Sequence, residues 1–515
     1  MVNLQTSASS QETSSKEGVQ IIARGASVGV LGRFISRIVR FFSLIILARI
    51  LGPKVFGLYA IGWTFLRIIG LVSTIGLENG VIRYGSLYWG KDVNKLNNVI
   101  RVSIGAVVII GIIIGILLFG FTPTLTRLVF RNPELDLVFR WIAPIIVLFS
   151  GVTVMSAVIR VSKKFEYSIL VEDLIQPIIG FLLAILFLIM GWKLEGLLAA
   201  LALSFILAFG AGLYFIYRLF PRILTTDSHL GNSFSNRQLF YFSIPTGIVT
   251  VCGILITFMG QLGLIYFSSE YEVGIYQAAF QISIMFPSIL SIFVLIFSPM
   301  ISNLYAQGEN RELEELFRIT TKWALYICLP SFLVIFFFSN QIMEALYGKE
   351  FIYGALSLII LSIAQLINAS TGAVGFLLMM TGRQNRWLLF SIFALIVNFI
   401  LCWVLITRLD LIGAAIATSI SISILFLFGL VDVRRTLGLW PYDKRFLKGI
   451  GASLFTCVIL LIFRTIFPLQ NPLVVVILGF IFSYGAFTLI LVGQGLDKED
   501  KEFLYLVRMK IREII

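Results

Sequence analysis

The sequence is poor in the residues that build metal, disulfide and nucleotide sites. Its 515 residues include a single histidine, His229, and four cysteines that lie far apart in hydrophobic runs: Cys252, Cys328, Cys402 and Cys457. Cysteines in such runs pack as small apolar side chains, and one histidine in a polar stretch cannot build a histidine-based metal site. The sequence also contains no P-loop motif for a nucleotide. We therefore predict no cofactor, no metal centre and no direct ATP hydrolysis.

Charged residues are also scarce, at 13% of the chain, whereas 58% of the residues are hydrophobic and the mean hydropathy is +0.97. Such a composition excludes an ordinary soluble domain and is typical of a polytopic membrane protein. The net charge of +13 is explained by Lys and Arg in cytoplasmic loops, so no nucleic-acid partner is predicted. Residues 1–20 are rich in Ser, Thr, Gln and Glu, which predicts a disordered cytosolic tail.

The hydrophobic runs predict an all-α protein with about 14 transmembrane helices of roughly 20 residues each. The predicted spans are 25–50, 57–78, 102–121, 141–160, 168–190, 195–217, 241–266, 274–302, 322–339, 354–380, 387–407, 411–431, 449–467 and 472–493. With the N-terminus placed in the cytoplasm, about 27 of the 40 Lys and Arg residues fall on the inner side. This bias predicts a multi-pass plasma membrane protein with both termini in the cytoplasm.

The chain repeats itself at an offset of 217 residues. Gly57 and Tyr59 recur as Gly274 and Tyr276, and further matches at this offset include Leu87 with Leu304, Tyr88 with Tyr305, Arg101 with Arg318, Gly196 with Gly413, and Arg218 with Arg435. The offset predicts two six-helix lobes, 21–220 and 238–437, which run in parallel because six is an even number. A cytosolic linker (221–237), two appended helices (438–495) and a cytosolic tail (496–515) complete the predicted domains.

Four arginines mark the first two spans. Arg33, Arg37 and Arg40 fall within about 60° of arc on one helix face, and the second span carries Arg67 with Thr64 and Thr74 on one face, near Glu78. A charge in the middle of a bilayer costs about 2.5–3.5 kcal/mol on insertion scales, so such residues face a protein interior or a watery cavity. Arginine presents a planar fork that suits phosphate oxygens. These residues predict a cavity for an anionic head group.

The same offset places a polar but uncharged face in the second lobe, formed by Thr250, Thr257, Gln261, Gln277 and Gln281. Two facing polar surfaces with one cationic wall would suit an amphiphile with an anionic, hydroxyl-rich head. Candidates for ion coupling are Glu78, Glu172 and Asp173. Other readings stay open: threonines often bond a backbone carbonyl of their own helix, Arg33 can reach the cytoplasmic face, Glu78 can cap its helix or pair with Arg83, and Glu172 and Asp173 can be interfacial carboxylates.

Several segments resemble the polysaccharide-transport (O-antigen flippase) family of the multidrug/oligosaccharidyl-lipid/polysaccharide (MOP) exporter superfamily. The similar segments are Leu51-Gly52-Pro53, Phe56-Gly57-Leu58-Tyr59, Gly76-Leu77-Glu78, Arg83-Tyr84 and Val273-Gly274-Ile275-Tyr276-Gln277-Ala278-Ala279. The resemblance covers roughly residues 20–495 and implies a MOP/MATE-like fold. It also implies a flippase for undecaprenyl- or dolichyl-linked oligosaccharides, whose cationic cavity corresponds in position to Arg33, Arg37, Arg40 and Arg67. Similar proteins often carry an acidic residue where this chain has Gln261.

The predicted function is therefore the flipping of a lipid-linked oligosaccharide by alternating access, without enzymatic activity. The predicted partners are the lipid-linked oligosaccharide, membrane lipids, and a glycan polymerase or glycosyltransferases; the predicted state is monomeric. A MATE-type drug or cation antiporter is the first alternative, but arginines would repel a cationic substrate. The second alternative is an integral-membrane glycan polymerase or ligase, which needs a general base or a metal-binding carboxylate pair. The longest predicted outer loop, 121–140, offers only Glu134 and Asp136.

Overall fold

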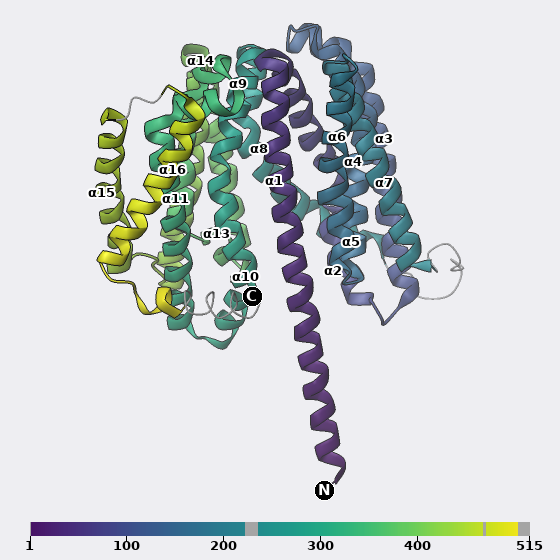
Figure 1. The fold of residues 1–515 in the computed structure, drawn as a ribbon. Coiled ribbons are helices and arrows are strands. Elements are labelled where there is room, and N and C mark those ends of the chain that lie inside the picture. The colour runs from purple at the N-terminus through teal and green to yellow at the C-terminus, as the bar shows by residue number, and fades with distance from the viewer. Residues whose placement is uncertain (1, 222–234, 467–469, 503–515) are drawn as a thin grey trace. The chain divides into compact units, whose positions relative to one another are not determined.

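The computed structural model describes residues 2–221, 235–466 and 470–502, and for 2–31, 33, 292–299 and 302 it describes the backbone alone. Within these ranges the chain consists of helices and short turns and contains no strand (Figure 1). Most of the predicted linker 221–237 and much of the predicted tail 496–515 lie outside the described residues. The first helix, α1 (Val2–Thr74), begins within the segment that the sequence predicts to be a disordered tail.

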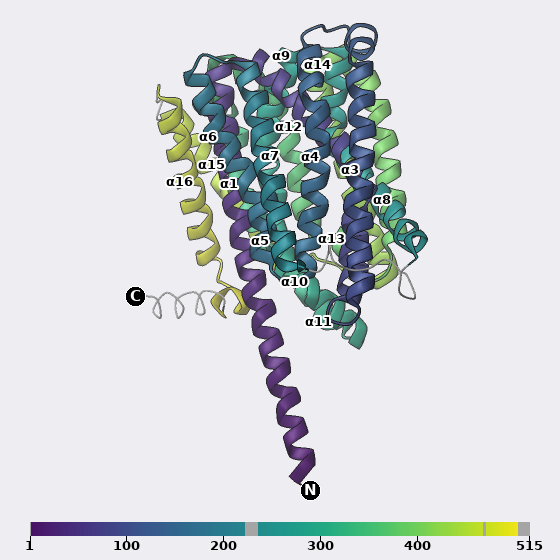
Figure 2. The same ribbon diagram turned by 90° about the vertical axis from the view of Figure 1, so that its right-hand side faces the viewer.

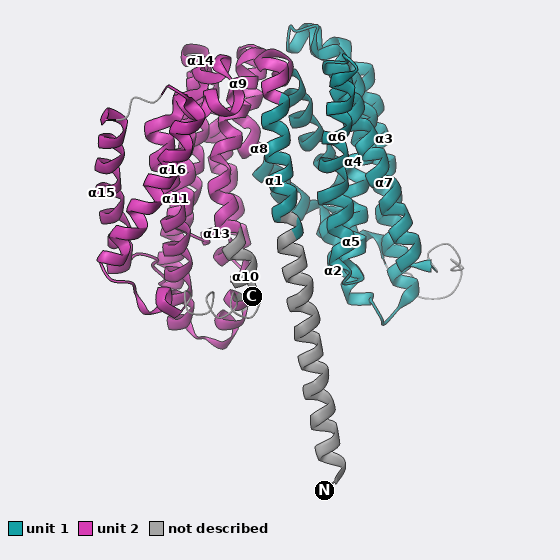
Figure 3. Ribbon diagram, viewed as in Figure 1, with its two compact units in different colours: residues 1–47, 58–254 teal, residues 48–57, 255–515 magenta. Residues whose placement is uncertain are grey.

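The chain divides into two compact units (Figure 3). Unit 1 comprises residues 1–47 and 58–254, and unit 2 comprises residues 48–57 and 255–515. The two lobes predicted from the sequence repeat, 21–220 and 238–437, meet at the linker instead. The units and the predicted lobes therefore assign parts of α1 and α8 (Asn236–Phe267) differently. The last residues of the first predicted span, 48–50, belong to unit 2, and α8 begins in unit 1 and ends in unit 2.

Unit 1 is built around α4 (Leu135–Val161), whose side chains are mostly buried and which packs against α2, α3 and α7 (Figure 1). Its remaining elements are α2 (Leu77–Tyr88), α3 (Val93–Thr124), the π-helical turn η1 (Leu125–Val129), α5 (Phe165–Ile169), the π-helical turn η2 (Leu170–Leu174), α6 (Ile175–Ile189) and α7 (Leu194–Leu219). Burial of the apolar surface of α4 stabilises unit 1.

Unit 2 contains the remaining helices. They are α9 (Glu270–Ser283), α10 (Met285–Gln307), α11 (Asn310–Tyr347), the 3₁₀ turn η4 (Lys349–Gly354), α12 (Ala355–Thr371), α13 (Val374–Met380), α14 (Gln384–Leu437), α15 (Lys444–Ile466) and α16 (Pro472–Gly493). The last two, α15 and α16, lie side by side and both pack on α11 (Figures 1 and 2). They correspond to the two helices that the sequence repeat predicts to be appended to the lobes.

The described residues contain eleven helices that are long and apolar enough to cross a membrane, so the class of multi-pass helical membrane protein is confirmed. The exact count of fourteen stays a prediction. Two helices, α1 and α14, each extend over two predicted spans, and the backbone of each helix breaks between them. The backbone of α1 leaves the helical region at Gly52 (φ 73°, ψ 170°), and that of α14 does so at Asp410 (φ 45°, ψ −121°).

Two predicted spans are interrupted in the structure. The predicted span 274–302 is divided between α9 and α10 at Ile284, and the predicted span 354–380 is divided between α12 and α13 at Gly372. Gly372 has a φ of 68°, and a Cβ there would lie 2.1 Å from Oγ1 of Thr321. Hydropathy reports which residues avoid water, but it does not report such a turn between two apolar segments.

A cluster of ion pairs attaches the segment after α16 to α11 and α15. The side chain of Lys322 on α11 is 3% exposed, and its Nζ lies 2.8 Å from Oδ1 of Asp500 and 3.5 Å from Oδ2 of Asp497. Lys448 on α15 donates to Asp497 at 2.7 Å. Burial alone would raise the pKa of the Asp497 carboxyl, but the hydrogen bond from Lys448 and the charge of Lys322 hold this pKa below its usual range. The cluster therefore stabilises the attachment of this segment above about pH 4 and loses strength as the pH falls further.

Replacing Lys322 with methionine is expected to lower the stability of the protein by about 1–3 kcal/mol, because Asp497 and Asp500 would each lose a charged partner and keep Lys448 and Trp323, respectively. The measurement is thermal unfolding of the detergent-purified variant. Lys498→Met is the matched control, because Lys498 is an exposed lysine in the same segment. Equal unfolding midpoints for the two variants would contradict a stabilising role of the Lys322 cluster.

Candidate functional site

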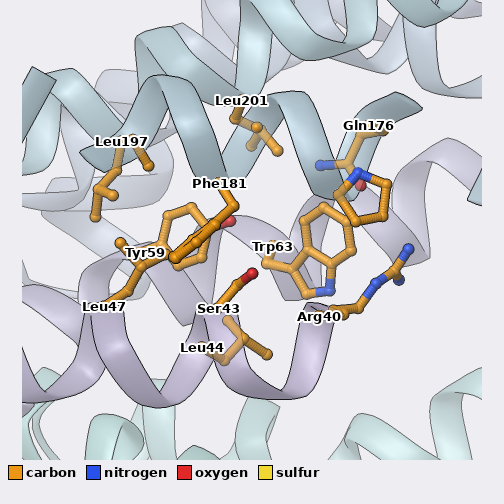
Figure 4. A pocket seen from close by; sticks show the side chains of 13 residues that line it. Arg40, Ser43, Leu44, Leu47, Tyr59, Trp63, Gln176, Phe181, Leu197 and Leu201 are labelled. Carbon is orange, nitrogen blue, oxygen red and sulfur yellow. The ribbon is translucent and has the colours of Figure 1, made fainter. Parts of the chain in front are cut away.

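The predicted arginine site lies in unit 1, where α1 and the helices around it form a narrow cavity of about 50 Å³. Arg40, Ser43, Tyr59 and Gln176 supply the polar part of its lining, and the apolar part comes mainly from Leu44, Leu47, Trp63, Phe181, Leu197 and Leu201 (Figure 4). The guanidinium carbon of Arg40 lies 5.6 Å from the centre of the Trp63 ring. This cation–π contact orients Arg40 while leaving its N–H groups available for hydrogen bonds.

Arg67 and Thr64 carry polar atoms that are buried and have no hydrogen-bond partner in the structure, namely Nε of Arg67 and Oγ1 of Thr64. Buried donors in native proteins are nearly always paired, and leaving one unpaired costs about 1–3 kcal/mol. Charges that act on Arg67 include those of Arg40 and Glu172. Arg40 and Arg67 therefore lie close enough for their charges to interact, and Nε of Arg67 can still donate a hydrogen bond.

Other members of the predicted set have simpler surroundings. Thr74 donates its hydroxyl hydrogen to the backbone oxygen of Leu71 at 2.8 Å, which is the local bond that the alternative interpretation expects. Arg37 is exposed, and its charge acts on Arg40. Arg33 lies on α1, and its side chain is outside the described residues. Among the predicted arginines, Arg40 and Arg67 are therefore the best candidates for binding an anionic head group.

The three acidic candidates also lie in unit 1, close to arginines. Glu172 accepts hydrogen bonds from the hydroxyl of Ser156 at 2.5 Å and from Arg160 at 3.0 Å. The charges of Asp173 and Glu172 act on Arg40, and the backbone oxygen of Asp173 accepts a hydrogen bond from Ser36. The third acid, Glu78, has a buried Oε2 without a partner, and the charges of Arg160 and Glu172 act on it. All three acids are thus neighbours of the arginine group.

The predicted second polar face is divided between the units. Thr250 belongs to unit 1 and donates to the backbone oxygen of Thr246 at 3.1 Å, again a local bond. Thr257 and Gln261 on α8, together with Gln277 and Gln281 on α9, belong to unit 2. Gln261 is 1% exposed and neither atom of its amide group has a partner, while Oε1 of Gln277 is buried without a donor. These two glutamines are the members of this face with unused hydrogen-bonding capacity.

Sequence reasoning missed four residues of the unit 1 site: Arg160, Tyr59, Trp63 and Gln176. Arg160 is the last residue of its predicted span, where an arginine reads as a cytoplasmic end. Ser156 precedes Arg160 by four residues, so the two side chains share one helix face, and this spacing is the signal that could have found Arg160. Tyr59, Trp63 and Gln176 resemble ordinary interfacial or core residues, and only the packing shows that they line the cavity with Arg40.

Solved structures show the same fold. The chain is similar to the lipid II flippase MurJ in an inward closed conformation, with a TM-score of 0.71, 16% identity and coverage of 90% of this chain and 99% of that one. It is also similar to an inward-facing multidrug resistance MATE family transporter of the MOP superfamily, with a TM-score of 0.65, 16% identity and coverage of 79% and 98%. The class defined by the fold is therefore a multi-pass helical membrane protein with the fold that these two transporters share.

The sequence itself identifies the family. The model of the family described as polysaccharide biosynthesis protein matches residues 22–305, more than half of the chain, and the chain belongs to this family. It is 23% identical over 193 residues to the probable low-salt glycan biosynthesis flippase Agl15 of Haloferax volcanii, covering 37% of this chain and 41% of that one. It is 25% identical over 194 residues to the capsular polysaccharide biosynthesis protein CapF of Staphylococcus aureus, covering 38% and 49%. The chain thus matches a little under half the length of these curated relatives.

Proposed function

We propose that this protein is a flippase that moves a lipid-linked oligosaccharide, carried on undecaprenyl or dolichyl phosphate, from the inner to the outer leaflet by alternating access. The observation that carries the proposal is the group of arginines in unit 1, in which Arg40 and Arg67 share one electrostatic neighbourhood and Nε of Arg67 has no partner. Bidentate guanidinium groups bind phosphate oxygens with charge-assisted hydrogen bonds. Family membership and the flippase names of Agl15 and MurJ support the same function.

The cavity beside Arg40, at about 50 Å³, has room for one or two water molecules rather than for a sugar. In the proposed mechanism the arginines bind the phosphate groups, the lipid tail stays in the bilayer, and the sugars occupy a larger space that forms during the transport cycle. No step breaks or makes a covalent bond, so the protein acts as a transporter and not as an enzyme. Moving charge across the membrane is worth about 2.3 kcal/mol per unit charge per 100 mV, which supplies a driving force.

The proposal includes a location and an orientation. The protein would be a monomer in the plasma membrane. Both termini would lie in the cytoplasm, because the predicted inner loops hold most of the Lys and Arg residues. In this orientation the head group would enter from the side on which lipid-linked precursors are assembled. A glycan polymerase or glycosyltransferase would then act before or after the flipping step.

The decisive experiment measures flipping directly. The purified protein is reconstituted into vesicles that contain a fluorescent undecaprenyl-pyrophosphate disaccharide, and a membrane-impermeant quencher reports the fraction of label in the outer leaflet. A flippase is expected to expose nearly all of the label within minutes, whereas protein-free vesicles expose about half. Labelled undecaprenol, which lacks the phosphates, is the matched control and is expected to show no protein-dependent flipping. Equal flipping of both lipids would contradict recognition through the phosphate groups.

The second candidate function is a cation or drug antiporter, because MATE family transporters share the fold. The sign of the charges in unit 1 separates the two. The arginines of unit 1 would repel a cationic drug. Of the three acids there, Glu172 is paired with Arg160 at 3.0 Å and the charge of Asp173 acts on Arg40. This leaves Glu78, whose Oε2 has no hydrogen-bond partner among the described residues. Protein-dependent uptake of a cationic dye into the same vesicles, without flipping of the disaccharide lipid, would favour the antiporter.

A further inference from the structure

We propose that Glu172 is an internal counter-ion that holds the place of the substrate's phosphate among the arginines of unit 1, and that Arg160 becomes an additional phosphate-binding residue when the Glu172 pair opens. This inference rests on the proposed function, since it requires a phosphate-bearing substrate. It assigns Arg160 a role in binding and gives Glu172 a role different from ion coupling.

The geometry of the pair comes first. Oε2 of Glu172 accepts hydrogen bonds from the hydroxyl of Ser156 at 2.5 Å and from NH2 of Arg160 at 3.0 Å, while Nε of Arg160 donates to the backbone oxygen of Ser156 at 3.4 Å. Arg160 and Glu172 are 24% and 34% exposed. The pair is therefore ordered by Ser156 but is not sealed inside the protein, so an incoming anion can reach the guanidinium group.

The backbone aims Glu172 at this position. Glu172 lies in the π-helical turn η2, between α5 and α6. A π-helical turn inserts one extra residue per turn and changes the direction in which the following side chains point, and such turns are frequent at functional sites. In the same turn the backbone oxygen of Asp173 accepts a hydrogen bond from the hydroxyl of Ser36 on α1. The turn thus ties the acidic segment to the helix that carries Arg37 and Arg40.

The charge of Glu172 also acts on several other charged residues of the site. It acts on Arg40, on Arg67 and on Glu78, in addition to the direct pair with Arg160. A carboxylate placed among several arginines occupies the electrostatic position that a phosphate would take, since both groups present oxygens to guanidinium forks. When the phosphate binds, it supplies these oxygens itself and Glu172 is free to withdraw.

An internal competitor of this kind sets affinity and release. The arginines Arg37, Arg40, Arg67 and Arg160 are opposed by Glu78, Glu172 and Asp173, so the group is close to electrical balance before the substrate arrives. Removing Glu172 would leave a more positive site that holds the phosphates longer. Removing Arg160 would leave Glu172 without its direct partner and available to compete at Arg40 and Arg67. The two substitutions should therefore change the affinity for the phosphate in opposite directions. Most of the change should be in the dissociation rate, as is usual for close charge pairs.

The test measures equilibrium binding of radiolabelled farnesyl pyrophosphate to the full-length protein in nanodiscs, with farnesol as the matched lipid without phosphate. Glu172→Gln is expected to bind farnesyl pyrophosphate about tenfold more tightly than the wild type, and Arg160→Gln about tenfold more weakly. The double variant is expected to return close to the wild-type affinity, because the competitor and its partner are removed together. Glu172→Gln is also expected to slow flipping in vesicles, since release becomes slower.

Glu166→Gln is the control, because Glu166 is an exposed acid on α5, and it should change nothing. Glu172→Asp, which keeps the charge on a shorter chain, is a second variant in case Glu172→Gln does not fold, and its affinity should lie between those of the wild type and Glu172→Gln. If both single variants bind more weakly, the pair is merely structural and the inference fails while the proposed function stands. If the wild type binds farnesol as well as farnesyl pyrophosphate, both fail.

Discussion

Arg40→Ala and Arg67→Ala are each expected to lower the flipping of a lipid-linked oligosaccharide by about 100-fold. The reason is that truncating one partner of a buried, charge-assisted hydrogen bond costs about 2–5 kcal/mol, and each 1.4 kcal/mol is a factor of ten. The measurement is complementation of a flippase-deficient strain of the source organism. Surface glycan should be lost while the lipid-linked precursor accumulates, with the vesicle assay run on the same variants.

Lysine substitutions refine this prediction, because lysine keeps the charge and loses the planar fork. Partial function of Arg40→Lys and Arg67→Lys would show that charge contributes more than bidentate geometry. Arg127→Ala is the matched control, since Arg127 is an exposed arginine of the same unit, and normal membrane insertion and thermal unfolding should be verified for every variant. Wild-type export by both alanine variants would refute the unit 1 site. The next residues to test would then be Gln261, Gln277 and Gln281.

The helical class and the break at Gly52 could be predicted from the sequence, because both depend on local properties. Long apolar runs need a membrane, and a glycine followed by proline ends a helix wherever it falls in the fold. The position of Arg40 and Arg67 on the faces of their helices followed from periodicity in the same way. What each face contacts did not follow, since periodicity identifies a face and not its partner.

The acidic half of the site shows where sequence reasoning ended. Glu172 and Asp173 could equally be interfacial carboxylates, and nothing in the sequence indicates that the turn carrying them is π-helical. The partners of these two residues come from other helices: Ser156 and Arg160 from α4, and Ser36 from α1. Contacts of this kind depend on packing between helices distant in the chain, so they were not accessible before the structure.

Two glycines in the segments that resemble the flippase family have a structural explanation. A Cβ on Gly57 would lie 1.8 Å from the backbone oxygen of Glu270, and a Cβ on Gly274 would lie 2.0 Å from the backbone oxygen of Pro53. These are the two positions that the offset of 217 residues pairs, and within unit 2 they lie against each other. Lys54 and Glu270 add an ion pair of 3.5 Å beside them. The segment 48–57 thus packs on α9 at a distance that only glycine allows.

Gly57→Ala and Gly274→Ala are each expected to lower stability by about 1–3 kcal/mol, the usual cost of forcing an extra methyl group into closely packed atoms. Here the neighbours are backbone atoms, which cannot turn away as a flexible side chain can. The measurement is thermal unfolding in detergent, with flipping assayed in parallel.

Gly485→Ala is the control, because a Cβ at Gly485 meets nothing within 4 Å and alanine is the better helix former. The double variant should cost less than the sum of the two single variants, since the first methyl group already separates the surfaces that the second would disturb. Single variants as stable as Gly485→Ala would show that segment 48–57 does not depend on this contact with α9, and simple additivity would show that the two methyl groups act independently.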